Sequence, residues 1–131
     1  MNESKQKILC IDDDNDTCVL VDFVLKEEGY DITSCNSAED GLFQARKGNF
    51  AAIILDNRFE RTDGVKICEE IRSFNSIVPI IFLSGEARPA EIEKALAARA
   101  NAYLVKPNDF EKLTETIVGL TGENRTKAVS N

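Results

Sequence analysis

Histidine is absent from this sequence, and its four cysteines form no C-x-x-C pair. The absence of histidine excludes Ser-His and Cys-His catalysis and most zinc sites, since these need an imidazole as base or ligand. It also excludes a phosphoryl carrier that uses its own histidine. The cysteines lack the spacing of zinc ligands, and we expect them to be reduced and to pack in the interior: Cys10, Cys18, Cys35 and Cys68.

Long apolar runs and an excess of positive charge are also missing. No tract is long enough to cross a membrane, and residues 1–7 lack the apolar run of a secretory signal. We therefore expect a cytoplasmic protein. The net charge of −7, from 16 basic and 23 acidic residues, disfavours direct binding to nucleic acid or to a membrane surface. It is compatible with a basic partner and equally with simple solubility.

The chain of 131 residues has the length of one domain, which we place at residues 1–121. Residues 122–131 are polar and patternless and predict a flexible tail. Within the domain, apolar segments alternate with segments of helical periodicity. Strands are expected at 7–11, 30–35, 51–55, 78–83 and 102–105, and helices at 15–28, 38–47, 65–74, 89–100 and 110–120.

This alternation predicts an α/β fold, a doubly wound five-stranded parallel sheet with five helices on both faces. We expect the strand order 2-1-3-4-5, which places the first and third strands side by side. Ser37 and Asp109 are predicted helix N-caps, and Gly29 is predicted to end a helix. In the first helix the spacing predicts a buried stripe: Leu20, Val21, Val24 and Leu25.

Polar side chains follow four of the five predicted strands. Asp12 and Asp13 follow the first strand, Asp56 the third, Ser84 the fourth and Lys106 the fifth. Taken alone, Asp56 is most simply a turn residue, but these strand ends meet at the edge where open α/β sheets bind ligands. Carboxylates about 4 Å apart repel by roughly 4 kcal/mol, so the cluster needs a proton or a cation. Oxygen ligands alone favour magnesium or calcium.

Such a cluster is suited to phosphoryl chemistry. An aspartate beside magnesium can act as a nucleophile and form an aspartyl phosphate. The transferred group carries charge on three equatorial oxygens, and these could be neutralised by the cation, the Lys106 ammonium and the Ser84 hydroxyl.

Four motifs in order carry a specific resemblance to a known family. They are Ile-Leu-Cys-Ile-Asp-Asp-Asp, Ile-Ile-Leu-Asp with Gly64 eight residues on, Pro-Ile-Ile-Phe-Leu-Ser-Gly, and Tyr-Leu-Val-Lys-Pro. Over residues 7–120 the chain resembles a response-regulator receiver domain of two-component signalling, with its flavodoxin-like fold. The resemblance implies that Asp56 accepts the phosphoryl group. It also implies that Asp13 holds Mg²⁺ (or Mn²⁺) directly, Asp12 holds it through water, and Asp56 and the Arg58 carbonyl complete the ligands.

The resemblance further assigns Ser84 and Lys106 as the hydroxyl and the lysine of the site and Tyr103 as the switch aromatic. It implies a phospho-accepting receiver, not a turnover enzyme, that takes its phosphoryl group from a histidine kinase or a histidine phosphotransfer protein. The face of the fourth helix, fifth strand and fifth helix would then switch and act on a downstream protein or a receiver dimer. The chain is expected to be either a stand-alone receiver or a piece of a longer regulator or hybrid kinase.

Some positions depart from the family pattern. Glu60 stands where a proline is usual, and Arg99 where a glycine is often found. Arg58 and Glu86 occupy rim positions that influence attacking water in this family, and we hypothesise that they pair and slow autodephosphorylation. Two solvated charges of little effect are the alternative.

Three other functions are compatible with parts of the sequence. Asp12, Asp14 and Asp16 resemble the start of an EF-hand, but the glycine and glutamate that its loop needs are absent. A phosphatase of the haloacid-dehalogenase type, with Asp12 as nucleophile, is a remote alternative. A degenerate receiver that acts as an interaction module without phosphorylation is the nearer one.

Two residues of the first helix are apolar beyond its core stripe. Val19 and Phe23 have a spacing that places them on one face. They either pack against the last helix or form a patch that docks the histidine-bearing partner or a second receiver.

Overall fold

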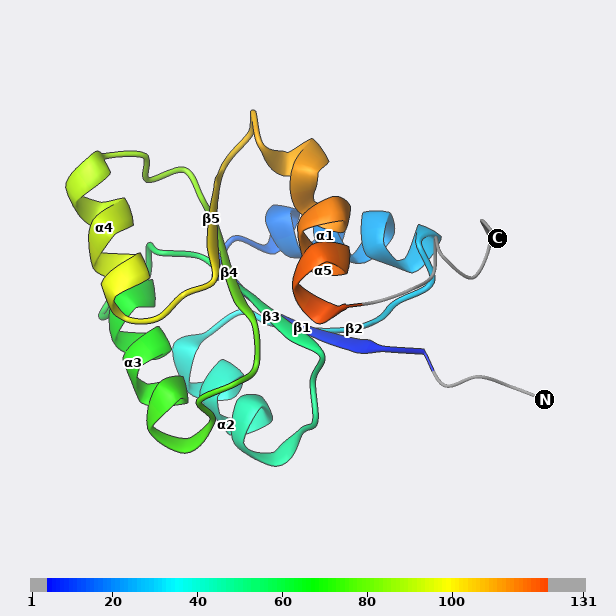
Figure 1. Ribbon diagram of the computed structural model, residues 1–131, viewed down its shortest axis with the longest axis horizontal. Coiled ribbons are helices and arrows are strands. Elements are labelled where there is room, and N and C mark those ends of the chain that lie inside the picture. The colour runs from blue at the N-terminus through cyan, green and yellow to red at the C-terminus, as the bar shows by residue number, and fades with distance from the viewer. Residues whose placement is uncertain (1–4, 123–131) are drawn as a thin grey trace.

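The computed structural model describes residues 5–122, which fold into five strands and five α-helices (Figure 1). The strands are β1 (Lys7–Ile11), β2 (Asp31–Cys35), β3 (Ala52–Leu55), β4 (Ile80–Ser84) and β5 (Ala102–Val105). The helices are α1 (Asn15–Glu27), α2 (Ala38–Lys47), α3 (Gly64–Phe74), α4 (Pro89–Ala97) and α5 (Leu113–Thr121), with a 3₁₀ turn at Phe110–Lys112 before α5. Of the predicted tail, all but Gly122 lies outside the described residues.

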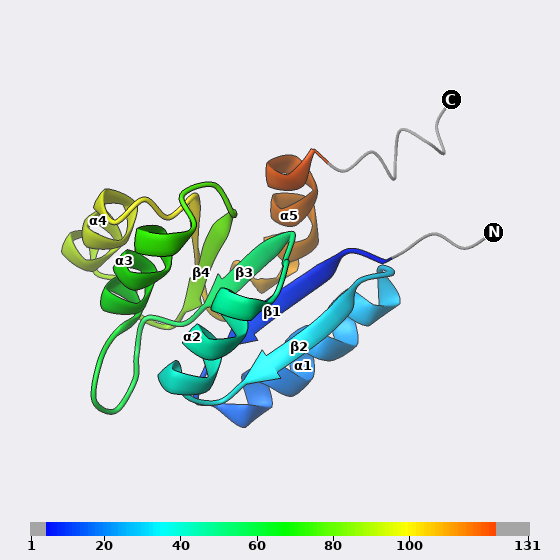
Figure 2. The ribbon, with the colours of Figure 1, turned by 90° about the horizontal axis from the view of Figure 1, so that it is seen from below.

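All neighbouring strands pair in parallel, in the order β2-β1-β3-β4-β5. The predicted fold class and strand order are therefore confirmed. Helices α2, α3 and α4 cover one face of the sheet, and α1 and α5 cover the other (Figures 1 and 2). In the described part of the chain, no helix has the length and apolarity needed to span a membrane.

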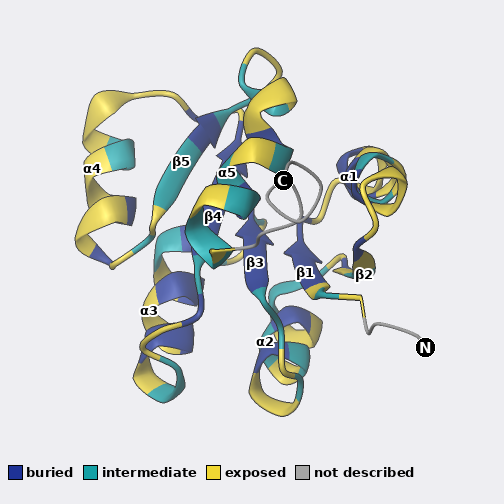
Figure 3. Cartoon of the chain, turned by 45° about the vertical axis from the view of Figure 1, so that its right-hand side comes forward, coloured by how far each residue is buried: buried dark blue, intermediate teal, exposed yellow. Residues whose placement is uncertain are grey.

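The central strands are buried on both faces, as Figure 3 shows. Each residue of β3 and β4 is buried, which explains why these segments are unbroken apolar runs instead of alternating ones. Alternate residues of one strand enter separate cores. In β3, Ile53 and Leu55 pack toward α3, while Ala52 and Ile54 pack toward α1 and α5.

Two of the three predicted helix-end residues act as expected. The Ser37 hydroxyl accepts a hydrogen bond from the Asp40 N–H and caps α2, and Gly29 follows α1 with φ of 94°. The predicted cap at Asp109 is wrong. Its carboxylate accepts from the Val105 N–H and pairs with Lys112, so it fixes the turn after β5 instead of a helix end.

The predicted buried stripe of α1 is wrong at one position. Val21 and Leu25 are fully buried, but Leu20 is 49% exposed. It lies beside Val19 and Phe23, which are 59% and 63% exposed and thus do not pack into the core. The sheet contacts a narrower strip of α1 than the hydrophobic pattern indicates, so an apolar patch of Val19, Leu20 and Phe23 remains at the surface.

Arg99 lies two residues after α4 with a left-handed φ of 75°, a conformation that strains a side chain with a Cβ. The loop is held there because the Arg72 guanidinium donates two hydrogen bonds, of 3.0 and 2.8 Å, to the Arg99 carbonyl oxygen. Arg72 is itself buried, so the strained residue is part of a firm connection between α3 and the α4–β5 loop.

The Arg99→Gly variant is expected to be more stable by about 0.5 kcal/mol, because relief of the left-handed strain exceeds the added backbone entropy of the unfolded chain. Chemical denaturation measures this difference. The control is Arg99→Ala, which removes the same side chain but keeps the Cβ and should bring no gain. An equal gain in both variants would assign the effect to the side chain and contradict the prediction.

Candidate functional site

Three carboxylates gather at the carboxyl ends of β1 and β3. Ile11 and Leu55 are paired in the sheet, so the residues that follow them emerge side by side, and the Asp56 N–H donates to the Ile11 carbonyl at 3.0 Å. Asp12, Asp13 and Asp56 each offer a carboxylate oxygen, and these atoms lie within 4.8 Å of one another. The convergence that the sequence predicts is present.

Lys106 brings a positive charge to this cluster from the end of β5. Its ammonium lies 3.3 Å from the Asp12 carboxylate and 3.2 Å from the Thr17 hydroxyl. Sequence reasoning missed Thr17, which has no motif of its own. It reaches the site because Asp14 caps α1 and orients its first turn.

Burial and repulsion make Asp12 an unusual carboxyl group. It is 2% exposed, and burial raises its pKa to about 6, with the Asp56 charge adding to the rise. The Asp14 N–H, 2.8 Å from Asp12 Oδ1, and the Lys106 ammonium lower its pKa and offset part of the effect. Three carboxylates against one ammonium leave a charge of −2 at neutral pH, which one divalent cation would balance.

The donor set fits magnesium. All donors are oxygens, and Mg²⁺ prefers oxygen ligands and usually keeps some of its waters. The three carboxylate oxygens lie within 4.8 Å of one another, close enough for one ion to be held by them directly or through a water. The cluster therefore suits a hard divalent cation better than a soft metal.

Ser84 and Tyr103 lie beside the cluster on the other side of Asp56. Ser84 is fully buried at the end of β4, and its hydroxyl oxygen accepts from the Glu86 N–H at 3.1 Å. The Tyr103 ring is stacked on Phe82, with centroids 5.3 Å apart, and its hydroxyl donates to the Glu86 carbonyl at 2.7 Å. The Tyr103 ring thus lies inward, and burial raises the pKa of its phenol.

The rim pair that the sequence suggests is present, but it is the weaker of two. The Arg58 guanidinium lies 3.6 Å from the Glu86 carboxylate. The Arg88 guanidinium donates a hydrogen bond of 2.8 Å to each Glu86 carboxylate oxygen, and the Arg88 backbone N–H donates a third, of 3.0 Å. These hydrogen bonds from Arg88 lower the pKa of Glu86 to about 2. Sequence reasoning missed Arg88, because a charge before a helical proline is indistinguishable from any exposed charge.

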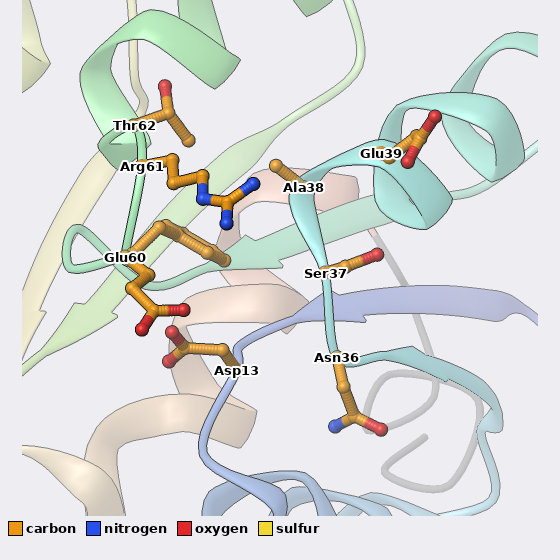
Figure 4. Close-up of a pocket in the computed structure, with 9 residues that line it drawn as sticks. Asp13, Asn36, Ser37, Ala38, Glu39, Glu60, Arg61 and Thr62 are labelled. Carbon is orange, nitrogen blue, oxygen red and sulfur yellow. The ribbon is translucent and has the colours of Figure 1, made fainter.

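Glu60, the departure in the β3–α3 loop, lies next to the acidic cluster. It lines a groove of about 300 Å³ between this loop and the start of α2, together with Asp13 and Arg61. In Figure 4 the Glu60 carboxylate points toward Asp13, and Arg61 reaches across the groove toward Ala38. The loop therefore adds one negative and one positive charge to the groove beside the site.

The comparisons with known proteins agree with the fold. The family model for the response regulator receiver domain matches residues 8–118, and the chain belongs to this family of phospho-accepting receivers. The transcriptional regulatory protein ZraR of Salmonella typhimurium is 33% identical over 89% of this chain, which covers 26% of ZraR. PcoR of Escherichia coli is 33% identical over 95% of this chain and 55% of its own length.

Solved structures give the same result. The response regulator TrrA of Thermotoga maritima, in complex with Mg²⁺ and BeF, has a TM-score of 0.80 and 30% identity over 88% of this chain and 98% of its own. The receiver domain of a sensor histidine kinase from Pseudomonas aeruginosa, with magnesium in its active-site cleft, has a TM-score of 0.83 and 28% identity. This second alignment covers 92% of this chain and 100% of the kinase receiver chain.

Proposed function

We propose that Asp56 of this receiver accepts a phosphoryl group from phosphohistidine. The observation that carries the proposal is the meeting of Asp12, Asp13 and Asp56 within 4.8 Å, with Lys106 3.3 Å from Asp12. One Asp56 carboxylate oxygen attacks the phosphorus, forming a P–O bond as the P–N bond to the donor breaks, and the departing imidazole takes a proton from solvent. Lys106 and the Ser84 hydroxyl then face the new phosphoryl oxygens.

Asp13 and Asp56 would hold Mg²⁺, or Mn²⁺ in its place, with Asp12 acting through water and the Arg58 carbonyl as a further ligand. When bound, the ion neutralises charge on the incoming phosphoryl group. The oxygen-only donor set, its short separations and its charge of −2 support this assignment, as do the magnesium-bound relatives.

The donor would be a histidine kinase or a histidine phosphotransfer protein, and the chain would not turn over a substrate. The apolar patch of Val19, Leu20 and Phe23 borders the site end of α1 and suits such docking. The chain spans about a quarter of ZraR and half of PcoR. We propose that its output passes through the face of α4, β5 and α5 to a downstream protein or a second receiver, without direct binding to nucleic acid or membrane.

Incubation with acetyl phosphate and Mg²⁺ tests the proposed function. Intact-mass measurement should show one added phosphoryl group, and EDTA should prevent it. A degenerate receiver would show no adduct under any condition. Appreciable turnover of p-nitrophenyl phosphate would instead support the phosphatase alternative and overturn the proposal.

The rim pair yields a prediction about the lifetime of the phosphoryl group. Arg58→Ala and Glu86→Ala are each expected to shorten it about two- to fivefold, because the pair restricts water at the site mouth. Arg88→Ala should not shorten it, since Glu86 is then free to pair fully with Arg58. Loss of the adduct mass over time measures the lifetime, with Arg61→Ala as the control from the same loop. Unchanged lifetimes in both rim variants would contradict the hypothesis.

A further inference from the structure

The residue directly after the proposed acceptor buries a polar side chain. Asn57 is 5% exposed, and among the described residues its amide oxygen has no hydrogen-bond partner. Its amide nitrogen donates to the Tyr103 hydroxyl at 3.3 Å. Burying an amide is unfavourable unless its hydrogen bonds are made. The hydrogen bond to Tyr103 is therefore the contact that can account for the burial of Asn57.

The contact belongs to a chain of hydrogen bonds that begins at Asp56. The Asn57 N–H donates to the Asp56 carboxylate at 2.8 Å, and the Asn57 amide donates to the Tyr103 hydroxyl, which donates in turn to the Glu86 carbonyl at 2.7 Å. Glu86 is fixed at its far end by Arg88. One residue thus contacts both the acidic cluster and the aromatic ring.

We propose that Asn57 is a positioning residue that holds the Tyr103 ring inward before any phosphoryl transfer and links its position to the state of Asp56. The Tyr103 hydroxyl can accept from Asn57 while donating to Glu86, so both bonds favour the inward ring. Because the Asn57 amide oxygen has no partner among residues 5–122, the amide is held there from one side only and can turn when its backbone N–H loses a charged acceptor.

Phosphorylation of Asp56 would shift that charge onto the phosphoryl oxygens, since the carboxylate becomes an acyl phosphate, a mixed anhydride whose carbonyl oxygen is neutral. A hydrogen bond to this neutral oxygen is weaker than one to a carboxylate. The same residue would therefore sense the change and pass it to Tyr103. This second part rests on the proposed function, whereas the inward position of Tyr103 does not.

The test uses fluorine NMR on the full chain grown with 3-fluorotyrosine. The chain has two tyrosines, Tyr30 and Tyr103, which lie in different cores, and Tyr30→Phe assigns the two signals. Without any phosphoryl donor, the Tyr103 signal of the parent chain should show little shift between H₂O and D₂O, as expected for a shielded ring. In Asn57→Leu, which keeps the volume without the amide, the inward-to-outward ratio should fall about fivefold.

A matched control separates positioning from simple loss of an amide. Asn36 donates its amide to the Asp12 carbonyl on the other side of the site, and Asn36→Leu should leave the Tyr103 signal unchanged. A second readout is the ultraviolet titration of Tyr103, whose pKa burial raises and the Asn57 hydrogen bond lowers. Release of the ring in Asn57→Leu should bring this pKa down toward the ordinary value of about 10, whereas loss of the hydrogen bond from a ring that stays inward would raise it further. If Asn57→Leu does not fold, Asn57→Ala takes its place in both measurements.

The outcomes separate this inference from the proposed function. An outward Tyr103 in the parent chain, or an unchanged ratio in the Asn57 variant, overturns the inference whatever the phosphoryl assay shows. An inward ring that is released by the Asn57 variant supports it even if no adduct forms. With acetyl phosphate and Mg²⁺, the adduct should shift the Tyr103 signal of the parent chain but not that of the variant. An equal shift in both overturns the link to Asp56.

Discussion

Asp56→Asn is expected to abolish the phosphoryl adduct completely while the chain stays folded. The amide lacks the charge and the nucleophilic oxygen of the carboxylate, so no acyl phosphate can form. Its oxygen can still accept the Asn57 N–H that Asp56 accepts at 2.8 Å, so the local geometry has no reason to change. Intact mass after incubation with acetyl phosphate and Mg²⁺ measures the loss, and circular dichroism checks the fold.

Asp16→Asn is the matched control for this prediction. Asp16 is an exposed aspartate in the first turn of α1, and its variant should accept one phosphoryl group as the parent chain does. An adduct of the same mass in Asp56→Asn would show that another residue accepts the group. That result would contradict the assignment of Asp56 as the phosphoryl acceptor, but it would not change the family to which the chain belongs.

The second large effect is expected from Asp12→Asn. Without metal at pH 7, this variant should be more stable than the parent chain by about 1–2 kcal/mol, because it removes a buried charge that repels Asp56. The gain is smaller than the pKa shift alone implies, since Lys106 loses its ion pair with Asp12 at 3.3 Å. The amide oxygen can still accept the Asp14 N–H, so the loop should keep its shape.

The pH dependence follows from the direction of the shift. The pKa of Asp12 is about 3.9 in an unfolded chain and about 6 in the folded protein, so the folded state binds more protons between these values. The contribution of Asp12 to stability is therefore full below about pH 4 and is lost as the pH rises through 6. The advantage of Asp12→Asn should appear over this interval and vanish at pH 4.

Thermal melts with and without Mg²⁺ complete this test. The ion should stabilise the parent chain, because it binds the folded cluster and relieves its repulsion, and it should stabilise Asp12→Asn much less. Asp16→Asn again serves as control and should respond to Mg²⁺ like the parent. If Mg²⁺ does not change the melting temperature of the parent chain, both the metal site and the proposed cause of the raised Asp12 pKa are contradicted.

The sheet and the acidic cluster could be predicted because both depend on the order of segments along the chain. Once the strand order is known, residues after β1 and β3 must emerge together, and Asp12 and Asp56 follow directly. Side-chain orientation depends on packing that no single segment encodes. Leu20 fits the helical pattern of α1, yet it faces solvent because the sheet reaches only part of that helix.

The hydrogen-bond partners of the site residues could not be predicted from the sequence either. In the sequence Asn57 is an ordinary residue of the loop after β3. Its contact with Tyr103 arises only in the folded sheet, where β4 alone separates β3 from β5. Asp109 precedes the 3₁₀ turn and is a residue type that often caps helices, but its carboxylate accepts from the Val105 N–H instead of from the turn that follows it. In each case a tertiary contact overrides a local preference.

The ion pair between Asp12 and Lys106 joins the first strand to the last. Its two residues come from opposite ends of the domain, so the site can be complete only when nearly the whole domain has been synthesised and β5 has docked. A nascent or partly unfolded chain with β5 detached would retain the carboxylates but lack the ammonium. Only a domain with all five strands in place could then receive the phosphoryl group. Incomplete or partly unfolded copies would not be phosphorylated and would transmit no signal.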